Sequence, residues 1–154
     1  DVTIVSLRDD PEKVRGALEQ VGIIEVPGGD ANWLLDWAKI AGLGDYLRNL
    51  LERDVIYIGG SAGNGLLMPD IGLTWWEPDD PTDHVGFGIV DFIVAVHCKP
   101  EDEQKNAANL KKRRTYMQTL INFPWKIYLL QDGQAIKVDG DAVAHIGPGE
   151  RVMV

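Results

Sequence analysis

Apolar and polar positions alternate along the chain with two different periods. Five short apolar runs, rich in β-branched residues, have the length of strands. They occupy residues 2–7, 23–26, 55–58, 90–97 and 125–130. More polar stretches, several with apolar residues at helical spacing, separate these runs. Because this succession is typical of βαβ units, we expect an α/β fold of three α/β/α layers around a mostly parallel sheet.

Local signals set the limits of the predicted helices and of one hairpin. Asp10 is a candidate N-cap with Pro11 at the first helical position, and Asp30 is the candidate cap of the next helix. A C-terminal β-hairpin is predicted around Asp139-Gly140, a dipeptide that favours tight turns. The predicted helices cover residues 11–22, 31–54, 61–68 and 101–123.

Residues whose groups could take part in catalysis lie where four of the predicted strands end. In open α/β sheets, ligands bind beyond the carboxyl ends of the strands, so these residues are expected along one edge. Together they offer an exposed glycine backbone, a hydroxyl, an imidazole and a carboxylate. In chain order they are Gly28-Gly29, Ser61, His97 and Asp132.

The sequence Gly-Gly-Ser-Ala-Gly at 59–63 fits the G-x-S-x-G pattern of a nucleophile elbow. There the serine occupies a strained turn between strand and helix, and small neighbours are needed because the chain passes close to itself. We expect Ser61 to be the nucleophile. The amides of Ala62 and Gly29 are the candidate oxyanion donors, within a substrate-binding turn that includes Gly28 and Gly60.

A hydroxyl is a weak nucleophile until a base removes its proton. His97 is the candidate base, and Asp132 the candidate acid that orients its imidazole. Each residue also has a plain structural interpretation, since such motifs arise by chance and Asp-Gly is a common turn. Their coincidence at successive strand ends favours a catalytic site.

Composition limits the partners of the chain. It has 154 residues, enough for one domain, and a net charge of −9 that argues against binding nucleic acid. No apolar run approaches the ~18 residues of a membrane span. Cys98 is the only cysteine, which excludes an internal disulfide, and we expect no metal or cofactor. We expect a cytoplasmic location, and we interpret Cys98 as structural.

Four segments, in order, resemble the peptidase E (aspartyl dipeptidase) and cyanophycinase family of serine peptidases. The resemblance covers almost the whole chain and implies a flavodoxin-like fold similar to class I glutamine amidotransferases. It makes Ser61 the nucleophile, His97 the base and Asp132 the acid, with Glu77 or Asp79 as an alternative acid in the following loop. The segments are IIEVPGGDANWLL, VIYIGGSAGN, VDFIVAVH and LLQDGQAI.

The chain departs from this family in three ways. It lacks the strand–helix units that usually come first, so we expect an N-terminally truncated domain whose apolar sheet edge favours a homodimer or other self-association. Asp30 follows the glycine turn, where a carboxylate disfavours an oxyanion unless it faces away as a helix cap. No Gly-x-Thr-Arg stretch follows His97, although residues 111–114 are basic.

Two other functions stay open at this point. An α/β-hydrolase-type esterase has the chain order Ser, acid, His, which Ser61, Asp132 and His145 satisfy. An inactive homologue that serves as a binding module is the second alternative. In the loop of residues 69–88, Trp75 and Trp76 are candidates for the wall or lid of a substrate pocket. The favoured prediction is a serine dipeptidase or small-peptide hydrolase that acts through an acyl-enzyme.

Overall fold

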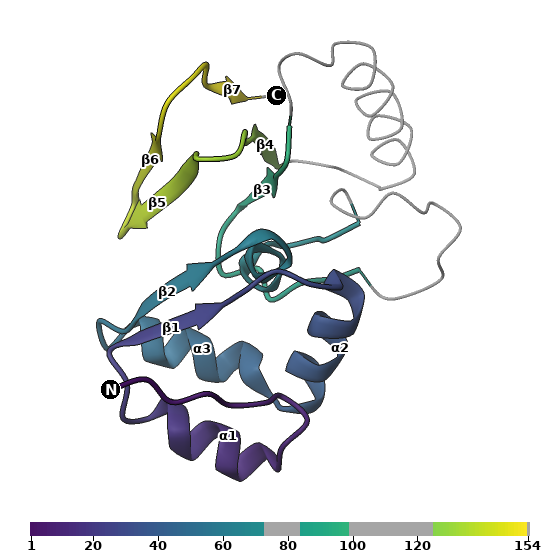
Figure 1. Cartoon of the computed structure of the whole chain (residues 1–154), viewed down its shortest axis with the longest axis vertical. Coiled ribbons are helices and arrows are strands. Elements are labelled where there is room, and N and C mark those ends of the chain that lie inside the picture. The colour runs from purple at the N-terminus through teal and green to yellow at the C-terminus, as the bar shows by residue number, and fades with distance from the viewer. Residues whose placement is uncertain (73–83, 99–124, 154) are drawn as a thin grey trace. The chain divides into compact units, whose positions relative to one another are not determined.

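A computed structural model describes residues 1–72, 84–98 and 125–153 of the chain (Figure 1). The chain divides into two compact units. The first comprises Asp1–Ile71 and Thr82–Val90, and the second comprises Gly72–Pro81 and Asp91–Val154. Within the described ranges, no helix has the length and apolar character needed to cross a membrane.

The first unit is built on two parallel strands. β1 (Ile23–Val26) pairs with β2 (Ile56–Gly59) in a register that aligns the first residues of both strands. Both strands were predicted from their apolar runs and are confirmed. The helices of this unit are α1 (Pro11–Leu18), α2 (Ala31–Ile40), α3 (Leu43–Leu51) and the 3-10 helix η1 (Ser61–Leu67).

The predicted helix caps are present. The side chain of Asp10 accepts a hydrogen bond from the Glu12 amide at 2.9 Å, and Pro11 begins α1. Asp30 Oδ1 accepts from the Trp33 amide at 2.9 Å and caps α2. The single helical stretch predicted up to residue 54 is divided at Gly42, whose φ of 66° separates α2 from α3.

Two predictions in this unit need correction. Residues 2–7 do not form a strand, and Val2 and Ile4 are almost fully exposed. A strand requires a partner for its ladder, and among the described residues the structure gives this segment none. The helix predicted over residues 61–68 exists as the tighter η1, because Gly63 and Gly65 lower the preference for an α-helix.

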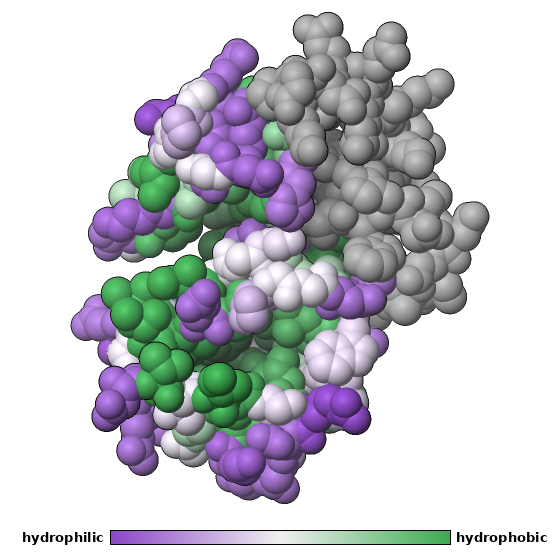
Figure 2. Space-filling view, viewed as in Figure 1, coloured by the Kyte–Doolittle hydropathy of each residue, from purple (hydrophilic) through white to green (hydrophobic). Residues whose placement is uncertain are grey.

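The β1–β2 pair buries one face and exposes the other. Ile24 is buried with the core of the unit, which includes Val14, Leu35 and Leu47. On the opposite face, Ile23 and Ile56 lie side by side, and each is 57% exposed. Figure 2 shows hydrophobic residues gathered over this part of the first unit. Parallel sheets normally cover both faces, so this apolar face is unusual.

The second unit contains the remaining described strands. β3 (Phe92–Ala95), completely buried, pairs in parallel with β4 (Lys126–Leu129), as predicted. β5 (Ala135–Asp139) and β6 (Ala142–Ile146) form the predicted hairpin. Its turn is Gly140-Asp141, with glycine at φ 56° in the first position, as a type II′ turn requires. β7 (Val152–Met153), which pairs antiparallel with β4, was not predicted from the sequence.

These elements confirm the α/β fold class. β1 and β2, which follow one another through α2 and α3, pair in parallel, β3 and β4 also pair in parallel, and β5 and β6 form a hairpin. The helix predicted over residues 101–123, its basic run at 111–114, and most of the loop that contains Trp75 and Trp76 lie outside the described residues. The predicted single domain is not tested by the division into two units and stays a prediction.

Candidate active site

Ser61 occupies the turn that leads from β2 into η1. Its backbone has a φ of 50°, in the left-handed region that residues other than glycine seldom adopt. This conformation costs about 1–2 kcal/mol, so it persists only where the surrounding structure enforces it. The strand, the strained serine and the following helix are the structural context that a nucleophile elbow requires.

Close packing of main chain enforces this turn. A Cβ atom placed on Gly28 would lie 2.9 Å from Ser61 Cβ and 3.5 Å from its Oγ. A Cβ on Gly63 would lie only 2.0 Å from the carbonyl oxygen of Val26, at the end of β1. The turn after β1 therefore lies directly beside the serine: a larger residue at Gly28 would displace Ser61, and one at Gly63 would collide with the backbone of β1.

Tyr57 adds a side-chain contact to the same turn. Its hydroxyl donates a 2.7 Å hydrogen bond to the carbonyl of Gly63, six residues further along the chain. Burial raises the pKa of the Tyr57 phenol, so the hydroxyl stays a donor well above neutral pH. This contact could not be predicted, because an aromatic residue in an apolar strand carries no sign of it in the sequence.

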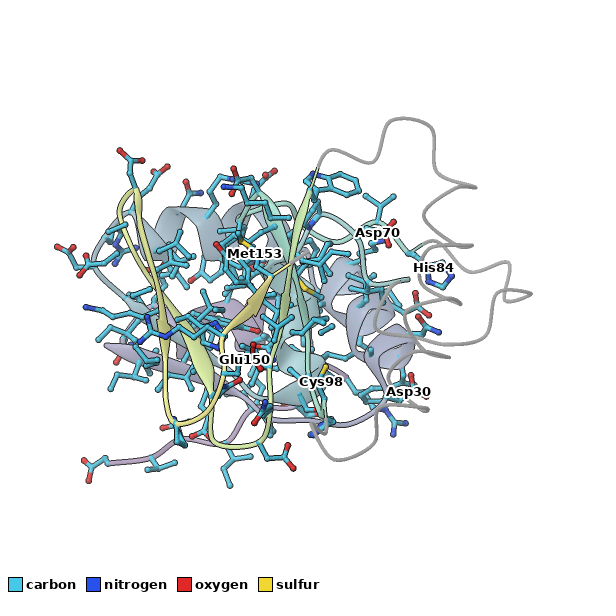
Figure 3. All side chains as sticks on the ribbon, turned by 90° about the horizontal axis from the view of Figure 1, so that it is seen from above. Asp30, Asp70, His84, Cys98, Glu150 and Met153 are labelled. Atoms are coloured by element: carbon cyan, nitrogen blue, oxygen red, sulfur yellow. The ribbon has the colours of Figure 1, made fainter. Side chains whose placement is uncertain are left out.

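The amides of Gly29 and Ala62 stay predicted oxyanion donors. Gly29 has a φ of 154°, and a Cβ there would meet none of the described atoms within 4 Å. The first hydrogen bond of η1 runs from the Gly63 amide to the Gly60 carbonyl at 2.8 Å. The Ala62 amide belongs to the residue just before Gly63, in the first turn of this helix. Asp30, labelled in Figure 3, has one carboxylate oxygen bound to the Trp33 amide as the α2 cap.

In the second unit, a β-bulge sets the position of His97. The Leu130 amide donates to the Ala95 carbonyl at 2.8 Å, and the Leu130 carbonyl accepts from Cys98 at 2.9 Å. A regular parallel ladder would use the amide of residue 97 for the second bond, so one extra residue is inserted here. His97 lies in the bulge with a φ of 59°. Bulges of this kind redirect side chains at the ends of strands.

His97 and Asp132 are joined by a hydrogen bond. The imidazole Nδ1 lies 2.9 Å from Asp132 Oδ1. Because a carboxylate only accepts, Nδ1 carries the proton and Nε2 is left as the basic nitrogen. Both side chains are largely open to solvent, with 62% of His97 and 76% of Asp132 exposed. The structure thus brings together the predicted base and the predicted acid.

The other candidates in this unit lie elsewhere. The ring of His145, on β6, meets Tyr128 edge-on with 6.4 Å between centroids, while Asp132 is engaged with His97. This geometry disfavours the esterase arrangement. Cys98 is half-buried, and its Sγ contacts the Ala95 carbonyl at 3.5 Å, which fits a structural role.

The remaining predictions concern an alternative acid and metal ligands. Glu77 and Asp79 lie outside the described residues. In the described part of the chain, no three His, Cys, Asp or Glu residues cluster as metal ligands would.

The predicted residues are therefore found in two groups. Gly28 lies beside Ser61 in the first unit, and His97 lies beside Asp132 in the second. The approach of the Ser61 hydroxyl to the imidazole stays a prediction.

A serine in a strained strand-to-helix turn and a His–Asp pair at other strand ends are the elements of a serine hydrolase built on an α/β fold. The chain belongs to peptidase family S51, whose model matches residues 1–146, and it is a serine peptidase of the peptidase E type. The family suggested by the sequence is thereby confirmed.

Among the solved structures that match the chain is one that resembles it over most of its length. It is the crystal structure of a "putative peptidase E protein" from Listeria monocytogenes EGD-e. The two share 19% sequence identity at a TM-score of 0.73, and the match covers 94% of this chain and 69% of the other. At this identity, the likeness shows the shared fold. No curated protein matches the sequence.

Proposed function

We propose that this serine peptidase hydrolyses small peptides, as a dipeptidase does, through an acyl-enzyme on Ser61. The proposal rests on the 2.9 Å bond between His97 Nδ1 and Asp132 Oδ1, which leaves Nε2 able to accept a proton. The left-handed backbone of Ser61 supports it, because such strain is characteristic of catalytic turns.

In the proposed mechanism, Ser61 Oγ attacks the peptide carbonyl while His97 Nε2 takes its proton. The amides of Gly29 and Ala62 donate to the developing oxyanion. The imidazolium, stabilised by Asp132, then protonates the amine as the C–N bond breaks, which releases the first product. Water attacks the acyl-enzyme with His97 again as the base, and Ser61 regains its proton as the acid product leaves.

A fluorophosphonate probe tests the nucleophile, because it reacts only with an activated hydroxyl. We expect one label on Ser61, no label on Ser61→Ala, and a loss of peptidase activity of about 10⁴–10⁶-fold in that variant. Absence of labelling in the folded wild-type protein would favour the inactive binding module instead.

The two histidines of the second unit provide a matched comparison for the base. His97→Ala should lose activity by about 10⁴-fold or more, whereas His145→Ala should keep most of it. Loss of activity in the His145 variant alone would support the esterase arrangement. Circular dichroism of both variants checks that they are folded.

A panel of dipeptides tests the substrate preference. We propose that the enzyme cleaves dipeptides in preference to longer peptides. In this panel the second residue stays constant while the first is varied, and kcat/KM is measured for each dipeptide. The values show which side chain the enzyme selects. Equal cleavage of long peptides and dipeptides would contradict the dipeptidase assignment.

Two finer expectations accompany this function. We propose that the exposed face of Ile23 and Ile56 supports self-association, and that the enzyme acts in the cytoplasm. Sedimentation velocity tests the first: Ile56→Lys should shift the protein toward monomer. Ile40→Lys, which replaces an exposed isoleucine on α2, is the control. Cell fractionation tests the second.

A further inference from the structure

The turn that presents Asp132 is held by the side chain of Gln134. The backbone amide of Gln134 donates a hydrogen bond to the backbone carbonyl of Gln131 at 3.1 Å, which closes a four-residue turn. Gly133, at its third position, has a φ of 88°, as in a type II turn. Asp132 is the second residue of this turn, so the geometry of the turn determines where its carboxylate points.

All the hydrogen-bonding groups of the Gln134 amide have partners. Its Oε1 accepts from the Gln131 amide at 2.9 Å. Its Nε2 donates to the carbonyls of Pro148 and Glu150, at 2.8 and 3.0 Å. One side chain thus fixes the start of the turn and ties it to the segment that precedes β7, on which Figure 3 labels Glu150.

The facing segment is shaped to admit these contacts. A Cβ on Gly147 would lie 2.3 Å from the Gly133 carbonyl oxygen. A Cβ on Gly149 would lie 3.0 Å from Gln131 Oε1 and 3.4 Å from Gln134 Nε2. Two glycines therefore allow the chain to pass directly against the turn, where a larger residue would displace it.

We propose that Gln134 is a positioning residue for Asp132. By fixing the turn of residues 131–134 against residues 147–150, it holds the carboxylate within reach of His97 Nδ1. The inference rests on the proposed function, since it assigns Gln134 an effect on activity only through Asp132. An amide is required, because a carboxylate would place acceptor atoms against two carbonyl oxygens.

The test is a double-mutant cycle between Gln134→Ala and Asp132→Ala, with dipeptide hydrolysis as the readout. Gln134→Ala alone should lower kcat by about 10–100-fold with little change in KM, as expected for a residue that supports a catalytic group. In the Asp132→Ala background it should change kcat less than about twofold, since the carboxylate it positions is gone. Equal losses in both backgrounds, or no loss in the wild type, would overturn the proposal.

A spectroscopic readout separates this proposal from the proposed function. In the His145→Ala background, the proton NMR signal of His97 Nδ1–H reports the bond to Asp132. We expect Gln134→Ala to broaden or shift it. If Asp132→Ala leaves activity intact, the assigned role of Asp132 is wrong, and this signal alone decides the proposal: an unchanged signal overturns it.

Two further variants guard against misfolding. Gln134→Met keeps the length of the side chain without its hydrogen bonds and should reproduce the loss in kcat. Lys137→Ala removes an exposed hydrogen bond to Asp139 on the same hairpin and should leave kcat and the His97 signal unchanged. A loss of kcat in Lys137→Ala equal to that in Gln134→Ala would refute the specific role of Gln134.

Discussion

The nucleophile turn in the first unit and the acid–base pair in the second are positioned by different means. Ser61 is held by main chain: Gly28 and Gly63 allow β1 and its turn to press against it, and its own backbone is strained. His97 and Asp132 are largely exposed, and one hydrogen bond between side chains joins them. The turn tolerates almost no change of shape, whereas the pair depends on proton placement and on the loops that present it.

This difference teaches which substitutions should matter at each place. Steric changes at the turn displace the reacting atom, and their effect grows with the size of the added group. Chemical changes at the pair alter the tautomer of the imidazole without altering packing.

Asp132→Asn changes the chemistry of the pair at nearly constant shape. The new amide can donate to Nδ1, which moves the imidazole proton to Nε2 and removes the base. We expect kcat to fall by about 10⁴-fold while the melting temperature stays within a few degrees. Steady-state kinetics and thermal denaturation measure the two effects. Retained activity would show that another acid, such as Glu77, orients His97.

Gly28→Ala adds one methyl group beside the nucleophile. Gly28 does not have a positive φ, so only the 2.9 Å approach to Ser61 Cβ is changed. Displacement of a reacting atom by about 1 Å costs roughly 10²-fold in rate, and we expect a loss of that order in fluorophosphonate labelling and in kcat.

Gly16→Ala is the matched control for this variant. A Cβ on Gly16, within α1, meets no described atom within 4 Å. We expect unchanged activity and a gain of about 0.5–1 kcal/mol in the free energy of unfolding. Equal kinetics in the two variants would show that the contact with Ser61 does not limit the reaction.

Tyr57→Phe removes one hydrogen bond from the nucleophile turn and keeps the aromatic ring. The Gly63 carbonyl loses the 2.7 Å contact, which should lower the free energy of unfolding by about 1–2 kcal/mol. Because the backbone packing remains, we expect kcat to fall no more than about tenfold. A larger loss would mean that the tyrosine, rather than the glycines, determines the geometry of Ser61.

The smallest expected effect concerns stability away from the site. A side-chain hydrogen bond from Arg53, and then one from Tyr46, lowers the pKa of Glu19. The stabilisation is therefore present above the unfolded pKa near 4.5 and is lost as the pH falls through the lower, folded value. Glu19→Gln should lower the melting temperature slightly at pH 7, and the difference should shrink as the pH falls below 4.5.

Features decided by local chemistry could be predicted from the sequence. Asp10, Pro11 and Asp30 define helix starts through contacts within three residues, and the structure has each of them. The strand before Ser61 and the turn around it follow from the G-x-S-x-G spacing. The pairing of His97 with Asp132 was expected because parallel neighbours end at one edge.

Features that depend on distant partners could not be predicted. Residues 2–7 have the composition of a strand but no pairing partner among the described strands, while β7 is too short to produce a pattern. The contacts of Gln134 reach Pro148 and Glu150, 14 and 16 residues away, and nothing in the local sequence indicates them. The bulge at His97 likewise depends on its neighbour β4.

A Cβ atom on Gly63 would lie 2.0 Å from the Val26 carbonyl oxygen, and this constraint also affects how homologues can diverge. That glycine is demanded by the crossing of two chain segments, irrespective of whether any bond is ever cleaved. In a homologue that has lost its activity, Ser61 could therefore be replaced, but Gly63 would still be required. A glycine at position 63 in a relative therefore indicates a conserved backbone crossing. The residue at position 61 is what separates an active enzyme from an inactive homologue.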